Sequence, residues 1–206
     1  MENVLNSGNN SYGELLTLSS MLKESEVVAV DCEMVICGSN YALARCSVVD
    51  HSLSVIADIY VRPDEPVTNY LTTVSGVTEK HLEGDEVYTF DTASKYIASC
   101  LHGKIVVGHT LWSDFKALQI VPLLPGNFLT LDLSELTVLK QPLAARYGLK
   151  SKYKLKEMVE MFVGDEIQTG KHCSVEDATT TMKLFHVLQK IYLPSGEASN
   201  VASLNV

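Results

Sequence analysis

Long apolar runs are missing from this 206-residue sequence, so we expect no membrane-spanning helix. The opening residues 1–11 also lack the basic and apolar pattern of a signal peptide. Cysteine is sparse, and its five copies include no C-x-x-C pair, which argues against a structural zinc site. Together these absences predict an intracellular protein whose thiols are reduced and which has no membrane partner.

Basic residues are also scarce, because 16 Lys and Arg stand against 25 Asp and Glu, for a net charge of −9. An acidic chain is not the usual partner of nucleic acid. The average can hide a local basic face, however, and no acid lies between Glu135 and Glu157. We predict that residues 140–156 line a nucleic-acid path, although a solvated loop and helix start would look the same. The basic residues there are Lys140, Arg146, Lys150, Lys152, Lys154 and Lys156.

The pattern of apolar residues predicts one α/β domain over residues 25–193, after a lead-in at 1–24 and before a disordered tail at 194–206. Alternating or continuous apolar residues predict strands at 27–34, 41–50, 55–61, 104–109 and 128–131. The short links between the first three strands indicate an antiparallel meander. Helical spacing predicts helices at 79–101, 111–121, 155–162 and 174–192. A mixed sheet flanked by helices accounts for this order.

Two acids end the first predicted strand, which reads Val-Val-Ala-Val-Asp-Cys-Glu-Met from Val27 to Met34. Side chains alternate faces along a strand, so Asp31 and Glu33 point the same way, roughly 7 Å apart. Two carboxylates at the end of a buried strand are costly unless a cation neutralises them. A divalent metal site explains the pair; a strand that merely ends in a polar loop is the alternative.

A third acid, Asp114, shares a helical stripe with apolar residues: Ala117, Leu118 and Val121. A carboxylate on the buried face of a short helix is unusual and indicates a functional position. Asp114 could instead belong to the first turn, where it would favour the helix N-terminus.

The fourth acid, Asp177, follows His172 in the stretch Lys-His-Cys-Ser-Val-Glu-Asp-Ala. Ser174 and Asp177 form a capping-box pattern, which could be their whole role. Asp177 nevertheless shares a stripe with Leu184 and Leu188, so we predict that it points toward the sheet. His172 precedes the helix on a loop and could reach the same place.

Four inward acids and a nearby histidine suit phosphodiester hydrolysis with two divalent ions roughly 4 Å apart. Carboxylates suit Mg²⁺ or Mn²⁺, and an imidazole can take the proton from the attacking water. Two other classes remain open: a nucleic-acid-binding module with little turnover, and a metal-dependent phosphatase with an Asp-x-Asp strand end. In the phosphatase the first acid is a nucleophile and the second is Asp, whereas here it is Glu33.

Five motifs then occur in order: Asp-Cys-Glu-Met, Ala-Leu-Ala-Arg-Cys-Ser, Val-Ser-Gly-Val-Thr, Val-Gly-His-x-Leu-x-x-Asp-Phe-x-Ala-Leu and His-x-Ser-Val-Glu-Asp-Ala. Over about residues 27–192 the chain resembles the DEDDh 3′→5′ exonucleases, in the branch of RNA exonuclease 4, the interferon-stimulated 20 kDa exonuclease and the apoptosis-enhancing nuclease. The resemblance implies a ribonuclease H-like fold with a five-stranded mixed sheet.

The resemblance also implies roles for single residues. Asp31, Glu33, Asp114 and Asp177 would hold two Mg²⁺ or Mn²⁺, and His172 would be the general base. Two further residues would lie near the substrate: Met34 against the terminal nucleotide, and His109 beside the second acidic motif. The substrate would be the 3′ end of a single strand, RNA in preference to DNA. The products would be nucleoside 5′-monophosphates, and we expect the enzyme to be a monomer. A role in RNA processing such as pre-rRNA maturation, in the nucleus or nucleolus, would follow.

One position departs from the family pattern. Where relatives usually read Asp-Tyr-Arg-Thr, this chain reads Asn69-Tyr70-Leu71-Thr72. An arginine could bond a ribose 2′-hydroxyl or a phosphate oxygen, and Leu71 can do neither. We therefore expect a weaker preference for RNA, or even a mainly DNA-degrading enzyme. Alternatively Leu71 packs under its loop, and Arg45 or Lys80 supplies the contact.

Overall fold

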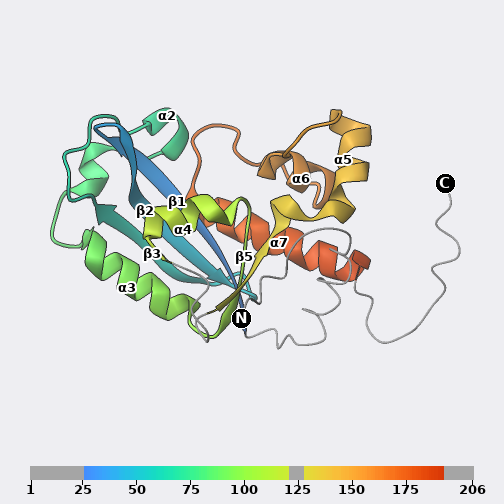
Figure 1. Cartoon of the computed structure of the whole chain (residues 1–206), viewed down its shortest axis with the longest axis horizontal. Coiled ribbons are helices and arrows are strands. Elements are labelled where there is room, and N and C mark those ends of the chain that lie inside the picture. Colours follow the sequence, from blue (N-terminus) through green and yellow to red (C-terminus); the bar gives the residue numbers. More distant parts are fainter. Residues whose placement is uncertain (1–25, 121–127, 193–206) are drawn as a thin grey trace, which may run out of the picture.

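A mixed β-sheet forms the centre of the computed structural model, which describes residues 26–120 and 128–192 (Figure 1). Its strands are β1 (Val27–Cys37), β2 (Asn40–Asp50), β3 (Val55–Arg62), β4 (Tyr88–Thr89), β5 (Lys104–Gly108) and β6 (Phe128–Asp132). The helices are α2 (Thr72–Ser75), α3 (Phe90–Leu101), α4 (Leu111–Leu118), α5 (Lys140–Tyr147), α6 (Leu155–Phe162) and α7 (Ser174–Tyr192). Three short 3₁₀ turns join them: Glu79–Leu82, Leu133–Glu135 and Thr137–Leu139.

The six strands lie in the order β4-β3-β2-β1-β5-β6. Strands β1, β2 and β3 are antiparallel neighbours, as their short links predict, whereas β5 and β6 run parallel to β1. The predicted α/β class and mixed sheet are therefore confirmed. The predicted count of five strands is wrong by one, because β4 is a two-residue strand beside the end of β3. A strand of that length leaves no periodic pattern in a sequence.

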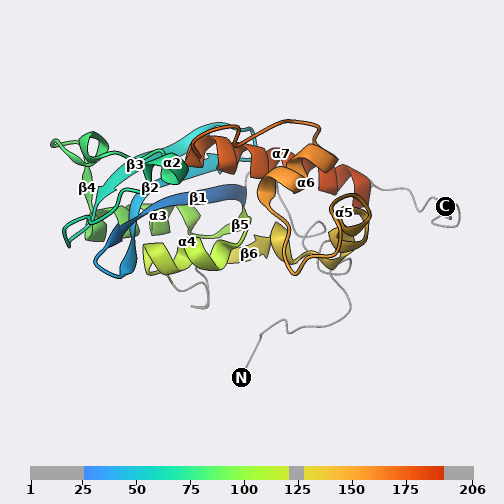
Figure 2. The same ribbon diagram turned by 90° about the horizontal axis from the view of Figure 1, so that it is seen from above.

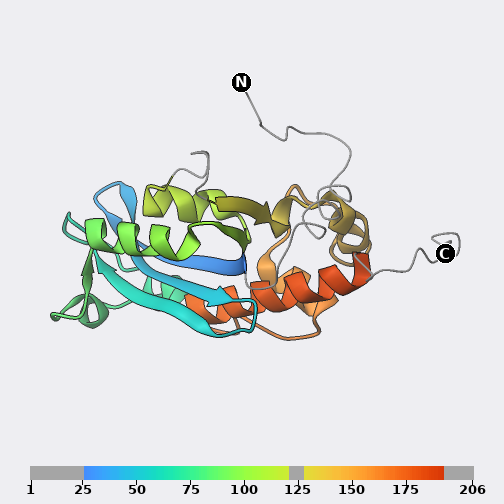
Figure 3. The same ribbon diagram turned by 90° about the horizontal axis from the view of Figure 1, so that it is seen from below.

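Helices cover both faces of the sheet, with α7 on one side and α3 and α4 on the other (Figure 2). Figure 3 shows α3 and α4 lying along the face of the sheet that is opposite α7. Alternate residues of β1 supply the two cores. Val28, Val30 and Cys32 pack with α3 and α4, whereas Val27 and Ala29 pack with α6 and α7. By the same alternation, the side chains of residues 31 and 33 leave β1 on the α7 face.

Strand β1 is longer than its neighbour on one side, and this leaves part of its edge uncovered by the sheet. The parallel strand β5 pairs only with residues 27–29 of β1. At the other end, the backbone N–H of Ile36 donates to the carbonyl of Asn69 at 2.8 Å. Between these two pairings, residues 30–35 offer an edge that other parts of the chain can approach. The candidate site lies there.

Several element boundaries differ from the predicted ones. The helix expected at 79–101 begins only at Phe90, because the chain before it turns at Gly84, which has a φ of 98°, and then forms β4. The side chain of Thr89 caps α3 by accepting the Thr92 N–H. The helix expected at 111–121 ends at Leu118, with Gln119 in the left-handed region. The helices predicted at 155–162 and 174–192 are confirmed.

Two helices, α2 and α5, have no counterpart in the sequence prediction; both are short. The predicted lead-in at 1–24 and tail at 194–206 lie outside the described residues. Within residues 26–120 and 128–192, no helix combines the length and the apolar character needed to cross a bilayer.

Candidate active site

Strand β1 carries the first two acids of the site on its α7 face. Asp31 is partly buried, and Glu33 is only 6% exposed. The Glu33 Oε1 atom is buried and has no hydrogen-bond partner among the described residues. Across the strand pair, Glu33 lies opposite Arg45 of β2, just before an irregularity in the register. A buried carboxylate oxygen without a donor is a costly arrangement that an added cation would relieve.

Asp114 reaches the same strand from α4, around its uncovered edge. It is 5% exposed, and its Oδ1 accepts the backbone N–H of Cys32 at 2.9 Å. The N-terminus of α4 is held in turn by Asp132 at the end of β6, whose two oxygens accept the N–H groups of Thr110 and Leu111, each at 2.9 Å. The predicted inward orientation of Asp114 is thus what the structure shows.

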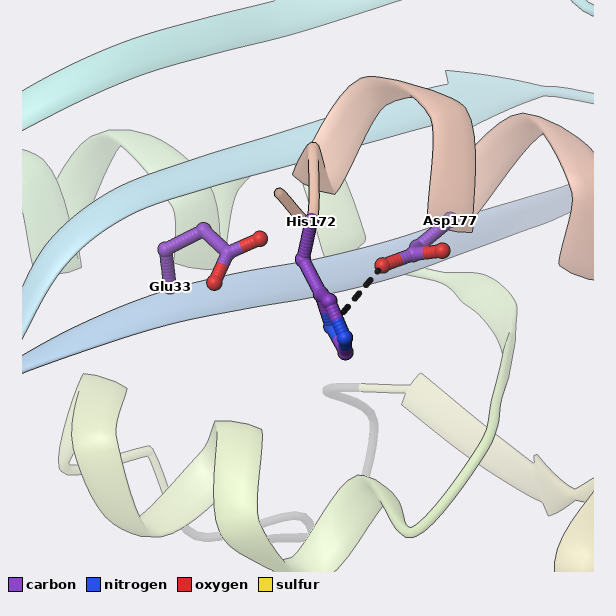
Figure 4. A group of neighbouring side chains, drawn as sticks. All are labelled: Glu33, His172 and Asp177. Carbon is purple, nitrogen blue, oxygen red and sulfur yellow. Dashed lines mark ion pairs between the residues drawn. The ribbon is translucent and has the colours of Figure 1, made fainter. Parts of the chain in front are cut away.

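The fourth acid, Asp177, comes from the first turn of α7 and is 2% exposed. Its Oδ1 accepts a hydrogen bond from the amide of Gln168 at 2.9 Å, and its Oδ2 lies 3.7 Å from Nδ1 of His172. Figure 4 shows the carboxylates of Glu33 and Asp177 on either side of the His172 ring. One ligand atom from each of these three residues lies within 4.8 Å of the other two.

The loop that carries His172 is fixed from both sides. The His172 backbone N–H donates to the carbonyl of Val74 at 2.7 Å. Next along the chain, Nη1 of Arg45 donates to the sulfur of Cys173 at 3.4 Å, and the hydroxyls of Ser174 and Ser47 lie 2.7 Å apart. The imidazole of His172 is therefore presented by an ordered backbone while its side chain stays 36% exposed.

Gly76 has a specific part in this packing. Its φ is 69°, and a Cβ at this position would lie 2.9 Å from the carbonyl oxygen of His172. A larger residue would be strained by the backbone conformation and would push the His172 loop away. The glycine of the motif Val-Ser-Gly-Val-Thr thereby lets two distant segments approach.

The carboxyl groups of this site are hard to ionise together. Burial, followed by the charge of Asp177, raises the pKa of Glu33 to about 8, although Arg45 opposes the rise. Burial also raises the pKa of Asp114 to about 7 and that of Asp177 above its ordinary value. The pKa of Asp31 is raised well above its ordinary value by burial and then by the charges of Asp114, Asp177 and Glu33. The four carboxyls thus share one electrostatic environment.

This donor set fits divalent cations. Buried carboxylate oxygens are the ligands that Mg²⁺ and Mn²⁺ prefer, and such a cation would offset the repulsion that raises these pKa values. The orphaned Oε1 of Glu33 would gain a partner at the same time.

The structure gives each of the three predicted substrate contacts a defined place in the fold. Met34 is partly buried and packs against the core formed with α3 and α4. His109 contacts the carbonyl of Tyr153 through Nε2 at 2.8 Å. Leu71 caps α2 with a φ of 49°, and its N–H donates to the side chain of Asn69 at 2.9 Å. Their roles toward a substrate stay predictions.

The basic stretch is less free than its sequence indicates. Lys150 forms an ion pair with Glu157 and Lys152 one with Glu135, while Arg146 pairs with Glu160. These acids lie at or outside the ends of the stretch in the sequence, and folding brings them onto it. Its predicted contact with nucleic acid stays a prediction.

Several residues that organise the site were missed by sequence reasoning. Gln168 orients Asp177 and Asp132 anchors α4. Arg45, which the sequence indicates only as a substitute for an arginine at position 71, is held by Asp58 through Nε and Nη2 at 2.8 and 2.9 Å. The sequence offers one weak indication: the acid of Asp132-x-Ser134 at a strand end forms a local turn, in which its Oδ1 accepts the Ser134 N–H.

Comparison with known proteins matches the exonuclease family model RNase_T to residues 28–185. RNA exonuclease 4 of Cryptococcus neoformans is 37% identical over 181 residues, which cover 86% of this chain and 42% of that protein. The apoptosis-enhancing nuclease of Rattus norvegicus is 38% identical over 170 residues, covering 80% and 49%. The chain thus spans about half the length of these relatives.

A solved structure shares the fold. The Neurospora crassa Pan2 catalytic unit, with its protease and nuclease domain, matches with a TM-score of 0.67 and 25% identity. The match covers 82% of this chain and 27% of that one. These comparisons confirm the branch that the motifs indicate and the ribonuclease H-like architecture.

Proposed function

This chain belongs to the exonuclease family, and we propose that it is a DEDDh-type 3′→5′ exonuclease that shortens single-stranded nucleic acid, RNA in preference to DNA. The observation that carries the proposal is the convergence of acids from three distant elements on one strand edge. Glu33, Asp114 and Asp177 are each buried, and each comes from a different element, β1, α4 or α7.

In this proposal Asp31, Glu33, Asp114 and Asp177 would hold two Mg²⁺ or Mn²⁺. When bound, such ions supply Lewis acidity, activate water and stabilise the leaving oxygen of a phosphodiester. The protein contributes orientation. The amide of Gln168 fixes one oxygen of Asp177, and the Cys32 N–H fixes one oxygen of Asp114. In each of these two carboxylates, one oxygen is thus held in place by the protein.

His172 would take the proton from the attacking water at a ring nitrogen. Its side chain is 36% exposed, whereas Glu33, Asp114 and Asp177 are buried, so a proton taken there can pass on to solvent. The nearby carboxylate of Asp177, 3.7 Å from Nδ1, would stabilise the imidazolium that forms. Cleavage of the terminal linkage would release a nucleoside 5′-monophosphate and leave a new 3′-hydroxyl.

The choice of RNA rests on the relatives, one of which is named an RNA exonuclease. By the same reasoning we propose a role in RNA processing such as pre-rRNA maturation, located in the nucleus or nucleolus. The enzyme would act as a monomer. Leu71 favours a second candidate, an enzyme acting mainly on DNA. At the position where the family pattern has an arginine, Leu71 offers no donor to a ribose hydroxyl, and Arg45 is already engaged by Asp58.

The proposal is tested with matched RNA and DNA oligonucleotides whose 3′ ends are free or blocked, in Mg²⁺ and in chelator. We expect stepwise shortening of free 3′ ends in Mg²⁺ only, with RNA degraded faster. Cleavage of blocked substrates at internal positions would contradict an exonuclease. Binding without turnover would identify a nucleic-acid-binding module, and release of inorganic phosphate alone a phosphatase.

A further inference from the structure

Three donor atoms of different chemistry meet at the site. Glu33, His172 and Asp177 offer two carboxylate oxygens and a ring nitrogen within 4.8 Å of one another, and the nitrogen lies 3.7 Å from the nearer oxygen of Asp177. Ligands about 2.0–2.2 Å from a tetrahedral zinc ion lie about 3.3–3.6 Å from each other. Small side-chain rotations would therefore bring all three onto one ion.

Each of the three side chains turns a ligand atom toward the others. Within the described part of the chain the Glu33 Oε1 atom is buried without a hydrogen-bond partner, and its carboxylate points toward the histidine (Figure 4). Gln168 occupies one oxygen of Asp177 and leaves the other facing His172. The backbone N–H of His172 is anchored at the Val74 carbonyl. This bond holds the ring beside the acids and does not involve the ring nitrogens.

This donor set distinguishes between metals. Mg²⁺ requires about six oxygen ligands in a near-octahedral arrangement and takes nitrogen poorly. Zn²⁺ accepts imidazole together with carboxylate, and three protein ligands with one open position are typical of its non-structural sites. The order of affinities for such mixed donors also places Zn²⁺ above Mn²⁺.

We propose that Zn²⁺ binds across Glu33, His172 and Asp177 and thereby inhibits the enzyme, an inference that rests on the proposed function of the same site. Coordination uses the lone pair of the His172 ring nitrogen, which the base needs to accept a proton. It also occupies two of the four carboxylates that would hold Mg²⁺. Zinc would thus remove the base and displace the productive metal in a single step.

A neighbouring thiol is the main competitor for zinc. Cys173 follows His172, but its sulfur accepts a hydrogen bond from Nη1 of Arg45 at 3.4 Å. Among the described residues, the ligand atoms that meet at the site are those of Glu33, His172 and Asp177, without the Cys173 sulfur, which separates it from a cysteine-based zinc site. X-ray absorption can distinguish the two, because Zn–S bonds are about 2.3 Å and Zn–N and Zn–O bonds about 2.0–2.2 Å.

The test measures Zn²⁺ binding to the metal-free full chain by competition with a zinc-responsive dye, with no nucleic acid present. His172→Gln should weaken binding about tenfold or more, since even residues that only orient a ligand are worth about 10- to 100-fold. Mg²⁺ binding should be unchanged in this variant. Two controls should bind Zn²⁺ like the wild type: His102→Gln, at an exposed histidine after α3, and Cys173→Ser.

Wild-type zinc affinity in His172→Gln, or a 2.3 Å sulfur shell that disappears in Cys173→Ser, would overturn the site. Activity is then measured separately in Mg²⁺ with added Zn²⁺. We expect wild-type turnover to fall and to return on addition of a zinc chelator. Unaltered turnover with zinc bound would overturn the inhibitory role. Absence of Mg²⁺-dependent nuclease activity would instead overturn the proposed function, while the dye measurement would still decide the zinc site.

Discussion

Asp114 accepts the backbone N–H of Cys32, at 2.9 Å, from the middle of the strand segment that bears Asp31 and Glu33. A side chain on α4 is thus tied to the backbone between the two other acids, across the edge of β1 that β5 leaves uncovered. This bond connects Asp114 to the strand backbone that carries Asp31 and Glu33, and so relates the positions of the three carboxylates.

Two substitutions of Asp114 should separate this structural bond from the proposed catalysis. In Asp114→Asn the side-chain oxygen can still accept the Cys32 N–H, whereas Asp114→Ala leaves that buried donor without a partner. We expect both variants to lose nearly all nuclease activity, and only the alanine variant to lose stability, by about 1–3 kcal/mol. Urea denaturation in chelator measures the stability. Equal stability of the two variants would contradict the role of the bond.

His172→Ala should slow turnover by about 10²- to 10⁴-fold, as expected for loss of a general base. Binding of Mg²⁺ and of RNA should persist, because the four carboxylates are retained and Mg²⁺ takes oxygen ligands. Single-turnover rates measure the loss of turnover, and calorimetric titration measures whether Mg²⁺ binding persists. A variant that no longer binds Mg²⁺ would make His172 a ligand of that ion.

Neutralising Lys150 and Lys152 tests whether the basic stretch contacts nucleic acid despite its ion pairs with Glu157 and Glu135. Each phosphate contact with a single strand releases a counterion and adds about 0.7 to the slope of log affinity against log salt. The double variant to Ala should therefore reduce the slope by about 1.4. Lys95→Ala, at an exposed ion pair on α3, is the matched control. An unchanged slope in the double variant would remove this stretch from the binding surface.

Leu71→Arg tests how the site reads the sugar. A charged hydrogen bond contributes roughly 1.5–3 kcal/mol, which corresponds to about a ten- to hundredfold change. We expect the ratio of kcat/KM for RNA to that for DNA to rise by up to this factor. The arginine inherits the left-handed backbone of Leu71, with a φ of 49°, so both residues bear similar strain. A folded variant with an unchanged ratio would show that position 71 does not read the sugar.

The sequence predicts well what depends on local periodicity. Residues 27–33 show both the buried strand and the shared face of its two acids, and the apolar stripe of α7 shows that Asp177 points inward. It cannot predict partners that only folding brings together. Gln168 lies on a loop and bonds to Asp177, and Asp132, at the end of β6, bonds to the N-terminus of α4. Arg45 contacts Cys173, which is 128 residues away in the sequence. The ion pairs of the basic stretch were missed for the same reason.

The pH dependence of the metal-free protein follows from the raised pKa values. Glu33 has an ordinary pKa of 4.5 and a pKa of about 8 in the fold, mainly because of burial. The folded state holds this proton more tightly than the unfolded state, so the stability that protonated Glu33 contributes is full below pH 4.5. It is lost as the pH rises through about 8. Bound Mg²⁺ should restore the stability lost at the higher pH.

Glu33→Gln tests most directly whether buried acids form the metal site, when it is measured for thermal unfolding in chelator at pH 8 and for RNA turnover in Mg²⁺. The substitution removes the charge and keeps the shape of a side chain that is 6% exposed. We expect a melting temperature equal to or above that of the wild type, together with loss of nearly all turnover. A folded variant with near-normal turnover, or one that unfolds in chelator at a much lower temperature, would contradict the assignment of Glu33 as a buried metal ligand.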